Sequence, residues 1–535
     1  MAASDLIELD NNIPPATLLV VAALLLPFLI LQLRRVLYPT YDPREPPVLR
    51  PKIPLIGHAF SIVWEGGGYF QRLYEASHLP ICTLPVLDGK LYLINSVPLI
   101  SAGLRSQNLS FDPFIELFSK NALGVSQREM DRFREDPGYL PSVTKAFHPS
   151  LSGEPLRGVA GKALGQIAAE LNRIGRGGGG GGDGEAHEIP NVADWLRDVM
   201  SQAIMMALYG SNNPVTPDVL DDVWEFDKSI TVLTLGLAPR WLAPRAVAAR
   251  RRIRAALRKY YMVGHDQGPD VSAYVRIRAA SRRQIGVDES DLVAGEVDIP
   301  WTSLINTIPS LAWVFTNVFS RSDYVARVRQ EVLEATTVVE EGSYSSSSSS
   351  SSHYCATIRA AELDKKPFLG ACFQEVQRLY NKLCGYRRVL EDTVLRDADG
   401  REYLLKKGNN AQWFHGVPHL SEEVWGPNAK VFNPERFIAT PPDEEKKRRG
   451  ALIPFGGGKH LCPGRRFAVT EVVCMVGAVS LLFDVEGVTV PAARAGYAGC
   501  AMAHPAWDTD TGGRSSRVSF RRRRGWEDVK LQFAV

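Results

Sequence analysis

One cysteine of this chain stands in a glycine-rich loop directly before a long apolar run. The loop reads Phe455-Gly-Gly-Gly-Lys-His-Leu-Cys462-Pro-Gly464, and the apolar run from Phe467 to Phe483 is long enough for a buried helix. Glycines allow tight turns and a close approach of the backbone to a bulky flat ligand. Backbone N–H groups and the helix dipole favour a thiolate at a helix N-terminus. A thiolate held in this way is what a haem iron requires as an axial ligand when it activates oxygen.

Cys462 has two interpretations. For a lone cysteine, an ordinary buried thiol beside a glycine-rich turn would be the better one. Here the spacing Phe-x-x-Gly-x-x-x-Cys-x-Gly is complete, at Phe455, Gly458, Cys462 and Gly464. The loop resembles the haem-thiolate loop of the cytochrome P450 family. The resemblance implies that Cys462 is the axial ligand of the iron of haem b, and that Phe455, Gly458 and Gly464 belong to the cofactor-binding loop.

Two further segments extend this resemblance. Glu375-Val-Gln-Arg378 lies in Phe368–Tyr380, which is predicted as an amphipathic helix, and residues three apart share one helix face. That spacing alone is also typical of a surface ion pair. Phe432-Asn-Pro-Glu-Arg-Phe437 follows some fifty residues on, as a rigid loop. The resemblance implies that Glu375, Arg378 and Arg436 form a buried charge triad behind the haem, which is tenable only if every charge is paired.

The segment from Trp301 to Trp313 departs from the family pattern. Most members carry an acid and a threonine on a long helix across the distal face of the haem, whereas this chain carries Asn306 and Thr307, with Pro309 two residues later. A proline within a helix removes one backbone hydrogen bond and kinks the helix. Asn306 and Thr307 are therefore the predicted catalytic residues, and the alternative is that they only cap free carbonyls at the kink.

The Asn-Thr-x-Pro arrangement resembles the branch that includes sterol 7α-hydroxylases and prostacyclin synthase. Some members of that branch hydroxylate, and others isomerise a peroxide without external electrons. The reaction type is therefore open at this point, although the cofactor is not.

The side chains that would meet the haem propionates are also predicted by resemblance. The Trp-x-x-x-Arg helix of the family is absent from Arg128–Phe147, where Arg132 and Lys145 are the alternatives. His460, two residues before the thiolate, and Arg388 stand where the family places propionate-binding side chains. Charge-assisted hydrogen bonds to such a carboxylate are strong.

The N-terminal sequence predicts a membrane anchor. Ala16–Leu33 is almost wholly apolar and just long enough to span a bilayer, and it is followed directly by Arg34-Arg35. The positive-inside rule places the rest of the chain in the cytosol, whereas a short buried core helix is the alternative. We expect an anchor at residues 1–35, a proline-rich hinge at 36–58 and a catalytic domain at 59–535. The resemblance implies a single-pass protein of the endoplasmic reticulum membrane.

Composition agrees with a large enzyme in a reducing compartment. Apolar residues make up 45% of the 535 residues, which is ample for a large core, and the formal net charge of +3 argues against a nucleic-acid partner. The seven cysteines include no Cys-x-x-Cys pair, which favours reduced thiols. No Gly-x-Gly-x-x-Gly follows a predicted strand, so a monooxygenase of this sequence needs a separate electron donor. The resemblance implies NADPH–cytochrome P450 reductase, with cytochrome b5 as a further candidate.

The predicted fold class is mainly α with small β-sheets, the cytochrome P450 fold. Strands are expected at Ile81–Leu84, Lys90–Ile94, Arg387–Leu395 and Val529–Val535. Arg521–Arg524 is expected as a solvated turn, and Gly177–Gly182 and Ser345–Ser352 as surface loops, because such tracts cannot bury side chains. Trp224–Arg252 is expected, from the family's order of helices, to form a membrane-facing lid over the substrate channel.

These features predict a membrane-anchored monooxygenase that hydroxylates a lipophilic small molecule of the terpenoid, steroid or polyketide type. The first alternative is a haem-thiolate isomerase or dehydratase that acts on a peroxide without external electrons. The second is a haem-binding protein without catalysis, for which neither the thiolate loop nor the membrane anchor would be needed.

Overall fold

A computed structural model gives the structure of the chain and describes residues 41–51, 57–86, 89–174, 186–236, 238–341, 353–494, 502–506 and 516–535. The chain forms two compact units. The small unit comprises the described residues of Met1–Leu109 and Tyr386–Trp413, and the large unit those of Ser110–Gly385 and Phe414–Val535. The predicted anchor and the two predicted surface loops lie outside the described residues. Of the helices within the described ranges, none is long and apolar enough to cross a membrane.

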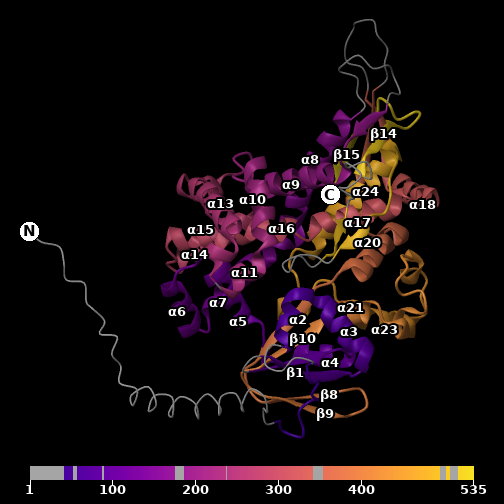
Figure 1. The fold of residues 1–535 in the computed structure, drawn as a ribbon. Coiled ribbons are helices and arrows are strands. Elements are labelled where there is room, and N and C mark those ends of the chain that lie inside the picture. The colour runs from indigo at the N-terminus through magenta and orange to yellow at the C-terminus, as the bar shows by residue number, and fades with distance from the viewer. Residues whose placement is uncertain are drawn as a thin grey trace, which may run out of the picture. The chain divides into compact units, whose positions relative to one another are not determined.

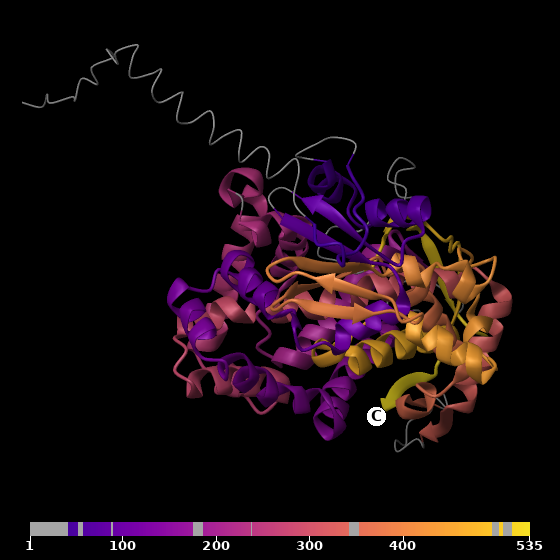
Figure 2. The ribbon, with the colours of Figure 1, turned by 90° about the horizontal axis from the view of Figure 1, so that it is seen from below.

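A five-stranded sheet forms the centre of the small unit. Its order is β1 (Ile81–Val86), β2 (Gly89–Ile94), β10 (Asn410–Phe414), β7 (Cys384–Val389) and β3 (Leu109–Ser110). Figure 2 shows its early strands, in indigo, beside strands from the later, orange part of the chain. β1 and β2 are antiparallel, and β10 joins β2 in parallel. The unit also contains α2 (Gly57–Glu65), α3 (Gly67–Ser77), α4 (Val97–Arg105), and a hairpin of β8 (Thr393–Arg396) and β9 (Glu402–Leu405).

The first two predicted strands are confirmed, as β1 and β2. The single strand predicted at Arg387–Leu395 is wrong, because β7 ends at Val389 and β8 begins at Thr393. The chain turns between them, where the Asp392 carboxylate accepts hydrogen bonds from the Lys407 backbone and the Lys406 ammonium. Polar contacts of this kind favour a turn over a continuous strand.

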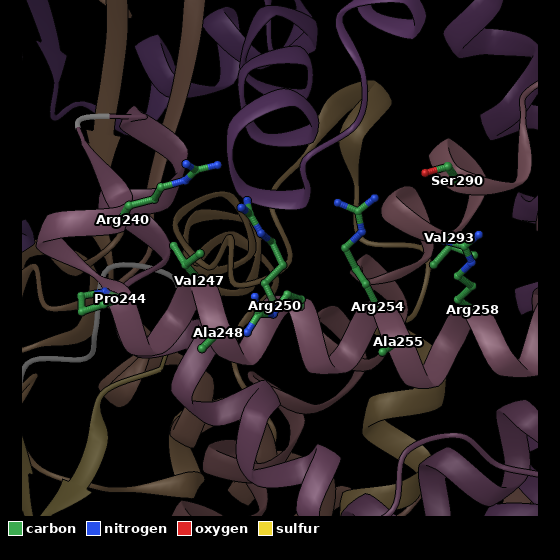
Figure 3. Close-up of a pocket in the computed structure, with 11 residues that line it drawn as sticks. Arg240, Pro244, Val247, Ala248, Arg250, Arg254, Ala255, Arg258, Ser290 and Val293 are labelled. Atoms are coloured by element: carbon green, nitrogen blue, oxygen red, sulfur yellow. The ribbon is translucent and has the colours of Figure 1, made fainter. Parts of the chain in front are cut away.

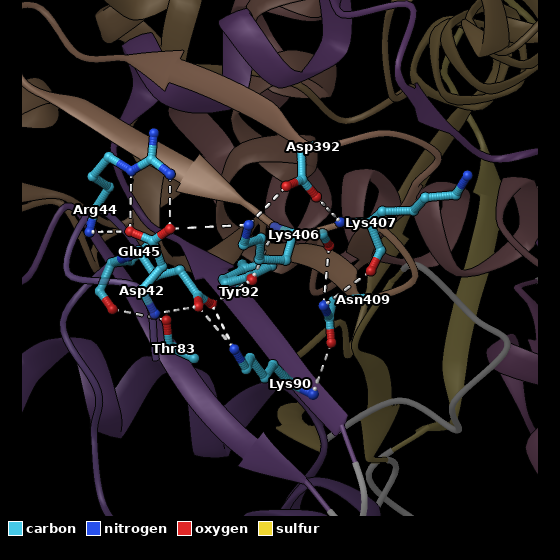
Figure 4. A network of polar contacts seen from close by, with 11 residues as sticks. Asp42, Arg44, Glu45, Thr83, Lys90, Tyr92, Asp392, Lys406, Lys407 and Asn409 are labelled. Atoms are coloured by element: carbon cyan, nitrogen blue, oxygen red, sulfur yellow. Dashed lines mark hydrogen bonds and ion pairs between the residues drawn. The ribbon is translucent and has the colours of Figure 1, made fainter. Parts of the chain in front are cut away.

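A buried carboxylate fixes the proline-rich segment of the small unit against the sheet (Figure 4). Glu45 is 8% exposed and accepts hydrogen bonds from Lys90 Nζ at 2.8 Å and from the Tyr92 hydroxyl at 2.7 Å. Thr83 of β1 adds a 2.8 Å bond from its hydroxyl to the Pro46 carbonyl. The prolines at this position cannot donate to a ladder, so these side-chain contacts add to the few backbone bonds of the segment, such as those from the Leu49 N–H to the Thr83 carbonyl at 3.0 Å and from the Thr83 N–H to the Pro47 carbonyl at 2.8 Å.

The large unit is mostly helical. The helices that position the candidate site are α15 (Glu289–Glu296), α16 (Asp298–Leu304), α17 (Thr307–Phe319), α18 (Ser322–Glu334), α20 (Pro367–Tyr380) and α24 (Arg465–Leu482). Those that frame the rest of the unit include α5 (Asp112–Phe118), the π-helix η1 (Ser119–Leu123), α6 (Gln127–Glu135), α7 (Tyr139–Phe147), α8 (Gly153–Arg173), α9 (Val192–Tyr209), α10 (Pro217–Lys228), α11 (Ile230–Leu235), α12 (Pro239–Leu242), α13 (Pro244–Met262), α14 (Ala273–Gln284), α22 (Glu422–Trp425) and α23 (Pro442–Ala451).

Three helices from distant parts of the chain pack together in the core of the large unit. Figure 1 shows α17, α20 and α24 as neighbours, and each is in contact with the other two. Every residue of α17 is buried, as is almost every residue of α24 from Phe467 onward. The apolar runs that predict these helices are therefore explained by burial on all sides rather than on one face.

The predicted helix at Phe368–Tyr380 is confirmed as α20. Pro367 stands at its first position, where a missing N–H costs nothing. The Glu331 carboxylate of α18 accepts hydrogen bonds from the backbone of Phe368 at 2.7 Å and of Leu369 at 2.9 Å. Since the first N–H groups of a helix lack partners within it, this carboxylate caps α20 from a neighbouring helix.

The C-terminal part of the chain completes two small sheets. In the first sheet, β14 (Val518–Arg522) lies between β11 (Phe483–Glu486) and β4 (His187–Ile189). In the second sheet, β15 (Lys530–Ala534) pairs in parallel with β6 (His353–Arg359), and β6 also pairs with β5 (Thr336–Glu341). The predicted last strand is thus confirmed.

The prediction of a solvated turn at Arg521–Arg524 is wrong. Arg521 and Arg522 belong to β14, and Arg522 is 5% exposed. Its guanidinium donates to the carbonyls of Leu171 at 3.0 Å and Ile174 at 3.1 Å, beside the end of α8. The last carbonyls of a helix lack partners within it, so this end of α8 offers the acceptors that make burial of Arg522 possible.

Candidate active site

The cysteine loop folds into tight turns ahead of α24. Gly456 and Gly458 have φ angles of +72° and +65°, which disfavour any residue with a side chain. The Cys462 N–H donates to the Phe455 carbonyl at 3.0 Å, which closes the loop. Cys462 is partly exposed and stands three residues before α24 begins at Arg465. Backbone conformation therefore requires glycine at Gly456 and at the motif position Gly458, whereas Gly464, with a φ of −80°, has no such requirement.

The residues that follow Cys462 favour its thiolate form. The backbone N–H groups of Gly464 and Arg465, with the Arg465 guanidinium, lower the pKa of the thiol. Burial has the larger effect and raises this pKa above its ordinary value. The thiolate therefore needs a further positive charge close to the sulfur, and a bound metal cation supplies one.

These residues fit a metal that brings most of its own ligands. Within the described ranges, no group of three or more His, Cys, Asp and Glu side chains is placed to hold an ion. Cys462 thus offers one thiolate and no partner ligands from the described residues. A haem would meet this condition, because its own ring nitrogens would supply the other ligands and Cys462 would supply the single thiolate.

Helix α20 supports the loop. The rings of Phe373 and Phe455 lie nearly parallel, with centroids 6.5 Å apart. The Asn381 side chain donates to the Pro454 carbonyl at 3.2 Å, and the Ile453 N–H donates to His419 Nε2 at 3.2 Å. His419 is buried, which lowers its pKa well below the usual value and keeps the ring neutral. The start of the loop is therefore held by fixed, uncharged groups.

Glu375 lies at the centre of a buried ion cluster. Its carboxylate faces the Arg378 guanidinium at 2.7 Å and 2.8 Å in a bidentate pair, and both side chains are 0% exposed. Arg436 Nε lies 3.5 Å from the same carboxylate, and the Asn433 N–H donates to it at 2.9 Å.

Carbonyl groups accept hydrogen bonds from the terminal nitrogens of the two arginines. Arg378 Nη1 donates to the carbonyls of His419 at 2.7 Å and Ala429 at 2.6 Å. Arg436 donates to the carbonyls of Trp425 and Asn428. The structure thus brings Glu375, Arg378 and Arg436 together with their charges paired, the condition under which a buried cluster is tenable.

The distal segment is broken, not merely kinked. α16 ends at Leu304, and α17 begins at Thr307 after the turn at Ile305 and Asn306. Pro309 lies in the first turn of α17, where its missing N–H would have no partner within the helix in any case. The Ser310 hydroxyl donates to the Asn306 carbonyl at 2.7 Å. The expectation of one kinked helix is therefore replaced by two helices in succession.

Sequence reasoning missed two side-chain contacts that join α17 to α20. Gln377 Nε2 donates to the Ser310 hydroxyl at 2.9 Å, and the Trp313 and Tyr380 rings stack with centroids 3.7 Å apart. The available signals were Gln377 inside the Glu-x-x-Arg motif and Ser310 four residues after Asn306. Through these contacts α20 positions both the Glu375 cluster and the start of α17.

The predicted propionate ligands are engaged with other groups. His460 Nε2 lies 3.2 Å from Asp112 Oδ1, and Lys459 Nζ lies 2.7 Å from Asp112 Oδ2. His460 and then Lys459 hold the pKa of Asp112 below its usual range. Arg132 pairs with Glu129 at 3.0 Å and donates to the Ile285 carbonyl at 2.6 Å.

Arg388 and its neighbour Arg387 differ in burial. Arg388, in the small unit, donates to the Gly408 carbonyl and is partly exposed. Arg387 is 7% exposed and lies over the Trp413 ring, 5.3 Å from its centroid. Alternation along a strand was the signal that could have singled out Arg387 as the inward-facing arginine of this pair.

A buried carboxylate of α10 was not anticipated. Asp227 is 1% exposed and accepts a 2.9 Å hydrogen bond from Trp301 Nε1 of α16, while its other oxygen has no hydrogen-bond partner within the described residues. Burial raises the pKa of Asp227 to about 6, against the opposing effect of the Trp301 bond. The native state thus binds this proton more tightly than the unfolded chain does.

Replacing Asp227 with asparagine is therefore expected to stabilise the protein at neutral pH. The native state loses stability as the pH rises from about 4 to about 6, because the carboxyl must then ionise in a buried site. The gain in free energy of unfolding should be larger by about 1 kcal/mol at pH ~7.5 than at pH ~5. Urea unfolding followed by tryptophan fluorescence measures it.

Asp221, an exposed carboxyl on the same helix, provides the control for this measurement. An Asp221→Asn variant should differ from the wild type by less than about 0.5 kcal/mol at both pH values. A gain for Asp227→Asn that is the same at both pH values would contradict a raised pKa.

Comparison with known proteins agrees with the site. A family model described as Cytochrome P450 matches residues 274–492. A cytochrome P450 monooxygenase of Gibberella zeae is 33% identical over 464 residues, which cover 86% of this chain and 85% of that protein. The chain belongs to the cytochrome P450 family. It is a haem-thiolate monooxygenase by class, and its resemblance to that family is confirmed.

Two further comparisons concern the branch and the fold of this P450. Cytochrome P450 7B1 of Mus musculus is 23% identical over 490 residues, covering 88% of this chain and 89% of that protein, and relatives of this kind agree with the resemblance to the sterol 7α-hydroxylase branch. The solved structure of a retinoic acid-bound cyanobacterial P450, CYP120A1, has a TM-score of 0.64 and 18% identity, and covers 90% of this chain and 100% of that one. The predicted fold is thereby confirmed.

Proposed function

We propose that this P450 hydroxylates a lipophilic small molecule of the terpenoid, steroid or polyketide type, with dioxygen and electrons from a separate NADPH–cytochrome P450 reductase. The proposal rests on Cys462, a single thiolate ligand held by the amides of Gly464 and Arg465 at the start of α24. Haem b, when bound, supplies the electron transfer and oxygen activation. The rest of the reaction depends on side chains of this chain.

The side chains of the candidate site have two proposed roles: some hold the haem in place, and others deliver protons. Cys462 would ligate the haem iron, Phe455, Gly458 and Gly464 would form the loop that holds the cofactor, and the paired charges around Glu375 would support that scaffold. The Asn306 amide and the Thr307 hydroxyl stand at the helix break, and Thr307 is 7% exposed. In this proposal they hold and pass protons to the distal side of the haem.

His460 and Arg388 are proposed to reach the haem propionates. Both make other contacts in the structure, His460 with Asp112 and Arg388 with the Gly408 carbonyl. For His460 the Asp112 carboxylate and a propionate carboxylate are equivalent partners, because either one can accept a hydrogen bond from the imidazole ring. Lys459 can hold Asp112 when His460 turns to a propionate.

Exposed apolar side chains support entry of the substrate from a membrane. Trp241 and Leu242 of α12 are 87% and 65% exposed, and Trp favours the membrane–water boundary. Residues 224–252 are thus proposed as a membrane-facing lid. We further propose a single-pass anchor at Ala16–Leu33 in the endoplasmic reticulum membrane, a cytosolic catalytic domain, and cytochrome b5 as a second electron donor.

A carbon monoxide difference spectrum tests this function. Full-length protein in vesicles, given NADPH and reductase but no chemical reductant, should develop the red-shifted Soret band of a thiolate-ligated haem. A band that appears only with dithionite would mean that reductase electrons do not reach the haem. In that case isomerisation of a peroxide without NADPH becomes the better assignment, and turnover of a hydroperoxide tests it.

Replacing Asn306 or Thr307 with alanine should uncouple electron use from product formation. Loss of a positioned proton donor costs about 100-fold in general acid catalysis, so NADPH electrons should be recovered mainly as hydrogen peroxide. The measurement compares peroxide release with NADPH consumption over a panel of lipophilic compounds. Thr302→Ala, on the exposed face of α16, is the control, and equal peroxide release from the variants and this control would remove both residues from proton delivery.

A further inference from the structure

A pocket lined by arginines lies in the large unit, among α12, α13 and α15 (Figure 3). Its volume is about 680 Å³. Five arginines line it, namely Arg240, Arg250, Arg251, Arg254 and Arg258. Figure 3 shows Arg240, Arg250 and Arg254 directed to the same side of α13. The pocket lies outside the set of residues assigned to the haem.

Its positive charge is not balanced by acidic side chains. None of the five arginines forms an ion pair with a carboxylate in the described part of the chain, whereas Arg252, outside the pocket, pairs with Asp222. The Asp291 carboxylate attracts the Arg254 guanidinium electrostatically without forming an ion pair with it. Asp291 already accepts hydrogen bonds from the Ser126 N–H at 2.7 Å and from the Ser126 hydroxyl at 2.6 Å. A cluster of like charges is costly without a counterion, so the pocket favours an anion.

Two of these guanidiniums are fixed close together. Arg250 Nη1 donates to the carbonyls of Asn121 at 2.7 Å and Ala122 at 2.9 Å, and Arg254 Nη1 lies 3.4 Å from the Gly124 carbonyl. A Cβ at Gly124 would lie 3.1 Å from Arg254 Nη1 and 3.6 Å from Arg250 Nη1. Both arginines are half-buried. The end of the π-helix η1 therefore holds them side by side before any ligand arrives.

Donors remain for a ligand. All the hydrogen bonds that Arg250 and Arg254 make to described residues come from Nη1, whereas a guanidinium has five N–H groups. Burial lowers the pKa of both side chains. The guanidinium of Arg254 lowers the pKa of Arg250 further, and the guanidinium of Arg258 lowers the pKa of Arg254 further. Planar guanidiniums suit the oxygens of phosphate in bidentate pairs.

We propose that this pocket binds a phosphate ester carried by a partly apolar molecule. A phosphate carries up to two negative charges and three acceptor oxygens, which match several converging arginines better than a single carboxylate does. Apolar side chains, Val247, Ala248, Ala255 and Val293, line the pocket beside the arginines and accept the rest of the ligand. The source is an acidic phospholipid headgroup or a soluble organic phosphate, since both present the same group.

The test uses full-length holoenzyme in neutral detergent. The probes are pyrophosphate, dioctanoyl phosphatidic acid and, as the phosphate-free control, dioctanoylglycerol. Trp241, beside Arg240 and 87% exposed, adds a fluorescence signal to calorimetric titration. If phosphatidic acid binds saturably and pyrophosphate does not, the pocket is a lipid headgroup site. If pyrophosphate also binds, and pyrophosphate and phosphatidic acid compete with each other, the pocket is a site for soluble phosphates. Equal responses to all three probes, or to none, would overturn the proposal.

Variants decide whether the binding is at this pocket. R250Q/R254Q should weaken binding at least tenfold, as expected for loss of charge-assisted hydrogen bonds from two arginines. R245Q/R276Q removes the same charge from exposed arginines that do not line the pocket, and should change the affinity less than twofold. If R250Q/R254Q does not fold, R240Q/R258Q replaces it. This variant removes two arginines that line the pocket but lack the hydrogen bonds at the end of η1. Equal losses in the control and both pocket variants would show non-specific attraction and overturn the proposal.

Discussion

Replacing Cys462 with alanine is expected to abolish the red-shifted Soret band of the carbon monoxide complex completely. The shift depends on a thiolate ligand to the haem iron, and the N–H groups of Gly464 and Arg465 lower the pKa of this one thiol. The measurement is the reduced carbon monoxide difference spectrum of the membrane-bound variant, together with its haem content. Monooxygenase activity should fall below detection in the same preparation.

Two companion variants make this result specific. Cys474→Ala changes a fully buried cysteine of α24, the helix that follows Cys462, and should keep the band, with a loss of stability of about 1–2 kcal/mol from the small cavity. Cys462→His offers a neutral nitrogen ligand and should bind haem without the red shift. Survival of the shifted band in Cys462→Ala would remove Cys462 from the iron and with it the whole assignment.

Replacing Glu375 with glutamine is expected to prevent haem incorporation. Arg378 and Arg436 would then share a buried site with no carboxylate, and Arg378 is 0% exposed. Removal of one partner from a buried ion pair costs about 3–5 kcal/mol, a large part of the stability of a folded protein. Haem content per purified protein and the free energy of unfolding measure the effect.

Glu435 provides the matched control for Glu375. It lies in the same loop as Arg436, but its ion pair with Arg327 is exposed, at 51% and 45%. Exposed pairs contribute less than about 1 kcal/mol, so Glu435→Gln should keep its haem and its stability. Normal haem content in Glu375→Gln would falsify the supporting role of the cluster.

The sequence was most informative where backbone geometry and burial both constrain the residue type. Gly456 and Gly458 ahead of Cys462 are required by positive φ angles, and the helix after it is recognised by an apolar run that is buried on all sides. Glu375 and Arg378 share a helix face, and their pairing follows from that spacing alone. Local rules therefore predicted these elements correctly.

Predictions failed where a distant part of the chain decides the environment. Arg522 is buried because the end of α8, some 350 positions earlier, offers carbonyl acceptors to its guanidinium. Asp227 is buried against Trp301, and nothing near either residue in the sequence indicates that contact. The arginine pocket likewise needs α13 and η1 to meet. Such contacts are tertiary, and a single sequence contains no local signal for them.

The position of β15 has a consequence for biosynthesis. This strand pairs in parallel with β6, which lies about 175 positions earlier in the chain, while the Asn172 side chain bonds the Leu531 N–H at 2.8 Å and its carbonyl at 2.9 Å. Domains commonly begin to fold during synthesis, at about 5–20 residues per second. At that rate β6 is synthesised about 9–35 seconds before β15. Until then one edge of β6 lacks its partner strand and is a surface that chaperones can recognise.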